Sequence, residues 1–212
     1  MHDFHRSGVA PAGMRNYLAQ PHWLYIATFA DGTTKVGTAA MPSKWRRLAE
    51  QGAVTAQYVA LADDGAVVRR LEDAVTKELG VSQFVRAAAK LAALCAPRST
   101  SELLEHNLRV ATAVREFLAE EDLDGFETVN EEWQGSSFSA ELTGGRPRIA
   151  YPQSLHSGTH GMRLESMLGA HALVTVDGSE LSFVADLGAL KGHKISFGDY
   201  TTEVPALQEA LF

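Results

Sequence analysis

A β-hairpin is recognisable between residues 22 and 40, and it limits the folds open to this chain. Its sequence is HWLYIATFADGTTKVGTAA, two runs of strand character joined by a polar loop. The Asp31-Gly32 pair supplies the positive-φ backbone that a tight hairpin needs. We therefore predict strands over residues 23–29 and 33–38. The hairpin is expected to bury Tyr25, yet it also places Lys35 directly before Val36 and Gly37, which raises the question of what a cation does at that position.

Helical and extended patterns alternate after the hairpin. Pro42 is pre-organised for a first helical turn and Gly52 is a stop signal, so a helix is expected between them. The segment AVTAQYVAL is rich in β-branched and aromatic residues and predicts a third strand. A second helix is expected to place Glu72 beside its apolar stripe, which repeats at helical spacing in Val68, Leu71, Val75 and Leu79.

The second half of the chain changes character. Ser99 and Glu102 have the spacing of a capping box, so a long helix is expected to begin there. Gly-rich turns and short β-like runs follow, namely ALVTV, LSFVAD and HKISFGD. We predict an α+β protein with an arm (1–21), a small antiparallel sheet with flanking helices (22–98), a connecting helix (99–122) and a β-rich C-terminal module (123–212). Trp133 and Phe138 are expected to anchor the core of that module.

The charge is divided unevenly. Residues 1–100 hold 12 Lys and Arg against 8 Asp and Glu, whereas residues 101–212 hold 7 against 18. Phosphate binding needs local cation density, so an anionic ligand such as nucleic acid is expected on the first half. No apolar run is long enough for a membrane span or a secretory signal, which favours the cytoplasm. The single Cys95 excludes an internal disulfide, and its apolar surroundings suggest a buried helix residue.

Polar residues stand in a telling order on the predicted elements: Tyr25, then Lys35-Val36-Gly37, then Arg46 and Arg47, then Glu72. This order over residues 22–95 resembles the GIY-YIG endonuclease domain, with Lys35 in place of the second tyrosine. The chain more closely resembles an uncharacterised bacterial family, known only as a domain of unknown function, in which such a segment is followed by a β-rich C-terminal module. That likeness is carried by His22, LYIA at 24–27, KVG at 35–37, Arg47 four residues ahead of QGA at 51–53, and GMRLESMLGAHALVTVDG. The cysteine-rich N-terminal segment of such proteins is absent from this sequence.

The resemblance implies a divalent-metal-dependent nuclease. Glu72 would bind Mg²⁺ or Mn²⁺, Arg47 would hold the phosphate, and Tyr25 would orient or deprotonate the attacking water. Lys35 would add positive charge, or act as a base if burial lowers its pKa. His22 would carry a proton.

Two further residues belong to the implied site. Gly37 would let the backbone approach the substrate, and Arg46 would bind it. The hypothesis requires a phenol, an ammonium, a guanidinium and a carboxylate to face one common hollow.

Each of these residues also has a structural interpretation. Tyr25 fits the core of a sheet, Lys35 and Arg46 fit a solvated surface, and Arg47 and Glu72 fit an ion pair. The alternative functions are therefore a non-cleaving binding or regulatory module, or an enzyme that uses the same pocket on a small molecule. The oligomeric state stays open. His156 and His160 have metal-ligand spacing, but the Ser-Gly-Thr between them favours a loop.

Overall fold

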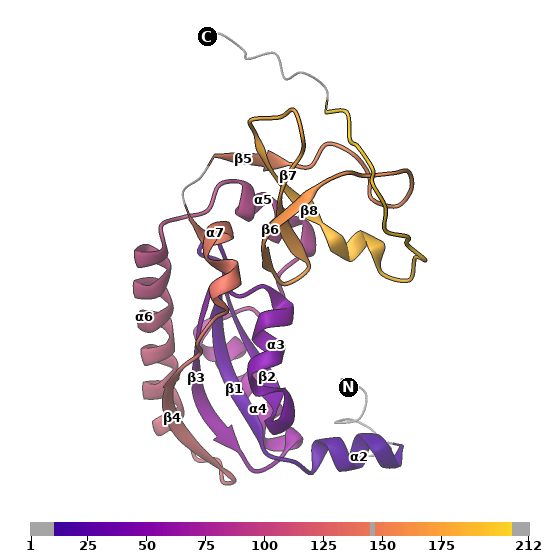
Figure 1. The fold of residues 1–212 in the computed structure, drawn as a ribbon. Helices are drawn as coiled ribbons and strands as arrows, with labels where there is room; N and C mark the ends of the chain where they lie inside the picture. Colours follow the sequence, from indigo (N-terminus) through magenta and orange to yellow (C-terminus); the bar gives the residue numbers. More distant parts are fainter. Residues whose placement is uncertain (1–10, 145–146, 205–212) are drawn as a thin grey trace.

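The chain folds as an α+β protein with two four-stranded sheets (Figure 1). We describe residues 11–144 and 147–204 of a computed structural model. Strands of the first sheet lie in the order β2-β1-β3-β4, and every neighbouring pair is antiparallel. Its strands are β1 (His22–Thr28), β2 (Thr34–Ala40), β3 (Thr55–Ala62) and β4 (Phe126–Glu132).

The predicted hairpin is confirmed as β1 and β2, which pair from Thr28↔Thr34 to His22↔Ala40. The Asp31 carboxylate accepts the backbone N–H of Thr33 at 2.8 Å, and Gly32 has a φ of 87°. This local chemistry closes the turn, which is why the sequence alone located it.

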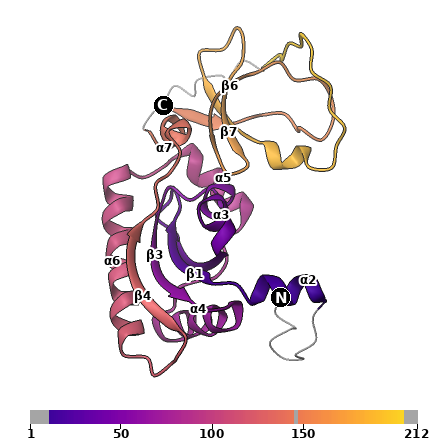
Figure 2. The same cartoon turned by 60° about the horizontal axis from the view of Figure 1, so that its bottom comes forward.

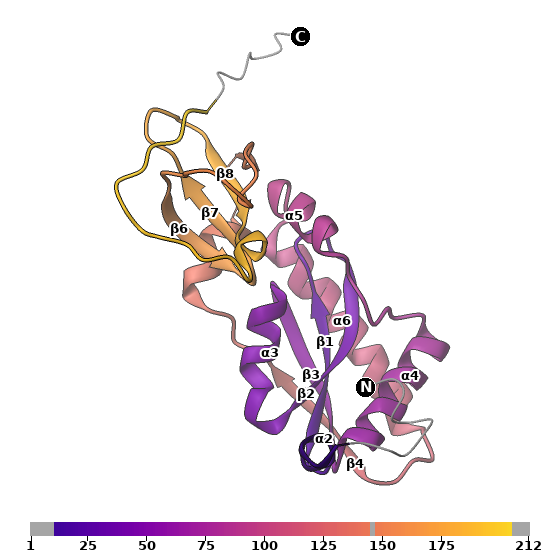
Figure 3. The same cartoon turned by 90° about the vertical axis from the view of Figure 1, so that its right-hand side faces the viewer.

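Helices cover both faces of the first sheet (Figure 3). Helix α3 (Lys44–Gln51) packs on one face, where Leu48 joins Trp23, Tyr25 and Tyr58. Helices α4 (Gly65–Leu79) and α6 (Thr100–Ala119) cover the other face, over Leu24 and Ile26. Because both faces are covered, every residue of β1 is buried.

The expected helix boundaries follow local capping signals. Gly52 ends α3 in the left-handed conformation, as its position predicted. Ser99 and Glu102 form the predicted capping box at the start of α6, with the Ser99 hydroxyl 2.7 Å from the Glu102 carboxylate.

Strand β4 corrects the expected boundary at residue 123. It returns from the C-terminal side and pairs with β3, so residues 126–132 belong to the first sheet. Trp133 is correspondingly buried beside Tyr58 in the first core, and Phe138 is 49% exposed, so neither anchors the second core. The sequence hid β4 because an edge strand is free to carry many exposed acidic residues, as FETVNEE does.

The C-terminal module holds the second sheet, ordered β5-β8-β7-β6. The runs ALVTV and LSFVAD form strands, as predicted. HKISFGD does not: Ile195 and Phe197 are 50% and 93% exposed, so the run lacks the buried face that stabilises a strand. The strands of the second sheet are β5 (Arg148–Ala150), β6 (Arg163–Leu168), β7 (His171–Thr175) and β8 (Ser182–Asp186).

Helices and short turns connect the two sheets. The module sits at one end of the first sheet (Figures 1 and 2), joined to it by a shared core that includes Ala30, Leu94 and Leu173. A Cβ at Gly169 would lie 2.9 Å from the Cα of Gly52, so backbone meets backbone at this contact. Two of the remaining short elements, η2 (Ser137–Ser139) and α7 (Ala140–Thr143), lie between β4 and β5 in the chain. The others are η1 (Met41–Ser43), α5 (Ala87–Cys95) and η3 (Leu187–Leu190).

The expected arm contains a helix, α2 (Ala12–Leu18), where the sequence indicated no sustained period. Leu18 is its buried residue and contacts the start of α4, so tertiary packing supports a segment too short to be stable alone. Residues 1–10 of the arm lie outside the described part of the chain. None of the described helices has the length and apolar character of a membrane span.

Candidate active site at the edge of β2

A cavity of about 330 Å³ lies at the β2 edge of the first sheet and is walled by residues of α3 and α4. We call it the β2-edge cavity. Six of the residues expected to form a site line it, although they come from four different elements. They are His22, Tyr25, Lys35, Gly37, Arg47 and Glu72.

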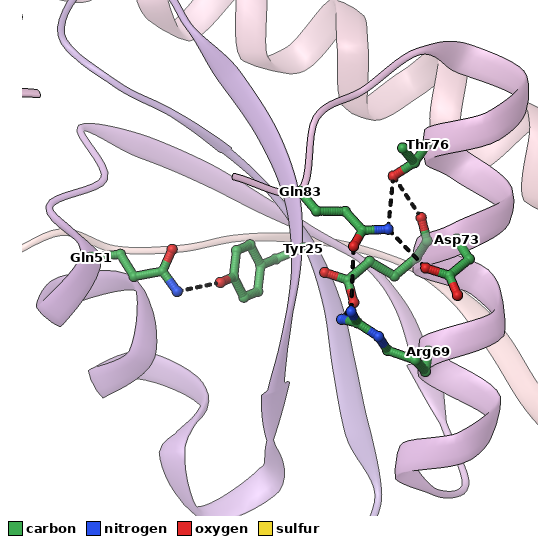
Figure 4. Close-up of polar contacts among 7 residues, drawn as sticks. Tyr25, Gln51, Arg69, Asp73, Thr76 and Gln83 are labelled. Atoms are coloured by element: carbon green, nitrogen blue, oxygen red, sulfur yellow. Dashed lines mark hydrogen bonds and ion pairs between the residues drawn. The ribbon is translucent and has the colours of Figure 1, made fainter. Parts of the chain in front are cut away.

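Tyr25 lines the cavity while also belonging to the core. Its partner across the hairpin is Gly37, and a Cβ there would lie 2.6 Å from the phenol oxygen. Gly37 therefore makes room for the ring beside the edge strand. Gln51 donates a hydrogen bond to the phenol oxygen at 3.0 Å (Figure 4). Burial raises the pKa of Tyr25 to about 12, although Arg47 opposes the shift, so the phenol is protonated at neutral pH.

Lys35 is a buried ammonium on the edge strand, only 9% exposed. Burial lowers its pKa to about 8; the Glu72 carboxylate opposes this shift, and Arg47 adds to it. A lysine with this pKa supplies positive charge at neutral pH and a free amine slightly above it.

Glu72 and Arg69 form an ion pair on one face of α4, and both line the cavity. Glu72 is 4% exposed, and burial raises its pKa against the opposing charges of Arg69 and Lys35. The side chain of Gln83 donates to Asp73 at 2.8 Å and to Thr76 at 3.1 Å, which holds the following loop against α4 (Figure 4).

His22 supplies a second candidate proton carrier. Its Nδ1 lies 2.7 Å from the carbonyl of Gln20, an arrangement in which the ring N–H donates there. Its buried Nε2 has no hydrogen-bond partner within residues 11–144 and 147–204. The ring borders the cavity, so this nitrogen is suited to accept a proton.

The two adjacent arginines of α3 have different positions. Arg47 lines the cavity, but Arg46 does not, and its guanidinium lies 3.4 Å from Glu50 on the exposed surface. The expected role of Arg46 in binding substrate at this cavity therefore has no geometric support. Successive helix residues point about 100° apart, which separates the two side chains.

Eight lining residues were absent from the site expected from the sequence, and four of them are polar or aromatic side chains of α2, α4 and the loop after α4: Tyr17, Arg69, Gln83 and Phe84. Arg69 had a usable signal, because it stands three residues before Glu72 on a predicted helix. The others are brought in by the packing of α2 and by the loop after α4, which no local pattern specifies.

The donor set bears on the implied metal ion. Among the described residues, no group of three or more His, Cys, Asp or Glu side chains is placed to hold a metal. Glu72 is a single carboxylate on the cavity wall, and Mg²⁺ is commonly held by one or two carboxylates together with waters and substrate phosphates. Glu72 is thus the one carboxylate of the described cavity lining that could take part in such a site, and it is paired with Arg69.

A larger cavity, of about 620 Å³, lies among loops of the C-terminal module. His156 and His160 line it from a loop, as expected, and the His160 ring bonds locally to Ser157 and Tyr151. This cavity contains none of the expected site residues. Lys35 and Glu72, two buried groups whose pKa values are shifted by burial and by each other's charge, line the β2-edge cavity. The β2-edge cavity is therefore the candidate active site, although its volume is smaller.

The chain matches no protein-family model, no curated protein and no solved structure, so no relative indicates which reaction the cavity supports.

Proposed function

We propose that this protein is a GIY-YIG-like, divalent-metal-dependent phosphodiesterase that acts on nucleic acid at the β2-edge cavity. The observation that carries the proposal is the convergence of the Tyr25 phenol, the Lys35 ammonium, the Arg47 guanidinium and the Glu72 carboxylate on one cavity. Those groups lie far apart in the sequence, and phosphodiester cleavage uses all of these chemical types.

Each group has a role that its environment suits. Arg47 and the charged form of Lys35 bind the phosphate oxygens and stabilise the charge that develops on them. The protonated phenol of Tyr25 donates a hydrogen bond and orients the attacking water, because its pKa is too high for a base. The neutral amine of Lys35 or Nε2 of His22 accepts the proton of that water.

Glu72 is the protein ligand for Mg²⁺ or Mn²⁺ in this proposal. A bound ion would supply Lewis-acid activation of the phosphate and of water. The chain's own contribution is to bury the carboxylate and to pair it with Arg69.

The test is cleavage of labelled single- and double-stranded DNA and RNA with Mg²⁺ or Mn²⁺. We expect Glu72→Gln and Arg47→Ala to lower the rate by about 100-fold or more, as loss of a charge-stabilising group does. Arg46→Ala is the matched control, since it removes the neighbouring guanidinium outside the cavity. With Lys35 as base, the wild-type rate rises through pH 8.

Cleavage that is equal in wild type and both cavity variants would sink the assignment, as would no cleavage of any substrate. The unfolding midpoint of each variant is measured as well, so that a folding defect is not mistaken for a loss of activity.

A non-cleaving anion-binding module is the second candidate. The ion pair between Arg69 and Glu72 favours it, because the carboxylate that would bind a metal ion already has a cationic partner. Oligonucleotide binding that depends on Arg47, without cleavage under any metal condition, would select this candidate.

A further inference from the structure

Phe84 borders the β2-edge cavity and is 72% exposed. A single exposed aromatic residue is ordinary in a protein surface. Phe84 differs because it stands beside a cavity lined by cations, and nucleic acid offers both phosphates for those cations and base faces for an aromatic ring.

The backbone that carries Phe84 is anchored through the two residues that precede it. The carbonyl of Ser82 accepts the Val36 N–H of the edge strand at 2.9 Å. The Ser82 hydroxyl donates to the Phe84 carbonyl at 2.9 Å and accepts the Phe84 N–H at 3.1 Å. Gln83, between them, is bound to α4 through Asp73 and Thr76 (Figure 4). Phe84 is thus presented on an ordered support, which reduces the entropy lost when a ligand packs on it.

A second aromatic residue borders the same cavity from another element. Tyr17 of α2 is 37% exposed, and its ring meets His22 edge-on with centroids 5.1 Å apart. The cavity therefore combines cations that suit a phosphate with aromatic rings at its border. Positive charge with interleaved aromatic side chains is the usual composition of a surface for single-stranded nucleic acid.

The charge distribution sets the side from which such a strand approaches. Strand β4, with exposed Glu127, Glu131 and Glu132, is at the edge of the sheet opposite β2. A polyanion is therefore repelled from the far edge and attracted to the edge that holds Lys35 and Arg47.

We propose that Phe84 stacks on an unpaired nucleobase whose adjoining phosphate lies against Lys35 and Arg47, so that the substrate class is single-stranded nucleic acid. This inference rests on the proposed function and names its substrate. A paired base has its faces covered by its neighbours in the duplex and offers Phe84 no surface on which to stack.

The experiment compares binding of a labelled oligothymidylate with that of an abasic oligomer of the same length and charge, measured by fluorescence anisotropy without metal. We expect the wild-type protein to bind the oligothymidylate at least about fivefold more tightly than the abasic oligomer, which is the usual contribution of stacking one base. Phe84→Ala should erase this preference and Phe84→Tyr should keep it. Phe197→Ala is the matched control, a 93% exposed phenylalanine outside the cavity.

The remaining outcomes separate the two proposals. Equal binding of both oligomers, unchanged in Phe84→Ala, would overturn the stacking inference even if metal-dependent cleavage were observed. Duplex bound as tightly as the single strand would also overturn it. No binding and no cleavage of any nucleic acid would overturn the proposed function and the inference with it.

Discussion

Lys35 carries the strongest electrostatic signature among the residues expected from the sequence. Its order in the chain, between Tyr25 and Arg47, was visible without a structure. Its burial was not, because the sequence alone favours a solvated lysine. The backbone of Lys35 pairs with β1 on one side and with Ser82 on the other, and the residue is buried. Tertiary packing, rather than any local pattern, therefore creates the base candidate.

The pKa of Lys35 predicts a pH dependence of stability. The folded pKa is about 8, against about 10.5 for an ordinary lysine, so between these values the unfolded chain binds more protons. Stability contributed through Lys35 therefore rises as pH rises from about 8 to 10. Above that range, Tyr25 acts in the opposite sense, since its pKa is raised to about 12.

The measurement is the free energy of urea unfolding from pH 7.5 to 9.5 in wild type and in Lys35→Met. Lys35→Met is expected to be the more stable at pH 7.5, with the difference narrowing as pH rises. Lys90 also has a lowered pKa, but it is present in both proteins and cancels. Parallel curves would contradict a buried, charged Lys35.

The pairing of β1 with β2 shows what a sequence pattern conveys about elements. The two runs of strand character and the Asp-Gly turn located both strands, because those signals are local. Strand β4 and the unpaired 193–199 run show the reverse. Whether a short, polar or isolated run becomes a strand depends on a partner supplied from elsewhere in the chain.

Gly37→Ala tests the contact that shapes this strand pair. The new Cβ would overlap the Tyr25 ring, so the ring or the edge strand must shift. We expect stability to fall by about 1–3 kcal/mol, the usual cost of overpacking, as read from urea unfolding. Gly13→Ala is the control: it lies in α2 with no heavy atom near the added Cβ, and stability there should hold or rise. Similar losses of stability in Gly37→Ala and Gly13→Ala would contradict the overlap between the new Cβ and the Tyr25 ring.

Across the whole molecule, the convergence of site residues was predictable in outline only. The order of Tyr25, Lys35, Arg47 and Glu72 in the sequence predicted that they share one site, and all four line one cavity. The same order also suggested Arg46, which the helix turns away. Loop residues such as Phe84 carry no periodic signal, so the border of the cavity required the fold.

The attachment of the C-terminal module gives a test at this scale. Gly169 and Gly178 both have positive φ, at 62° and 78°, so alanine strains the backbone at each. Only Gly169 touches the first domain, where its Cβ would meet Gly52. We expect thermal unfolding of Gly169→Ala to occur at a clearly lower temperature than that of Gly178→Ala, with easier proteolysis between the sheets. Equal thermal unfolding midpoints in the two variants would mean that the close approach of Gly169 to Gly52 contributes little to stability.

The return of β4 to β3 determines where the gene can be divided. A fragment cut after α6 would keep every group of the β2-edge cavity, yet it would leave β3 without its outer neighbour. Bare donors and acceptors along such an edge recruit strands from other copies. A minimal fragment that stays in solution must therefore extend past residue 133, well beyond Phe84, the last residue in the sequence that lines the cavity.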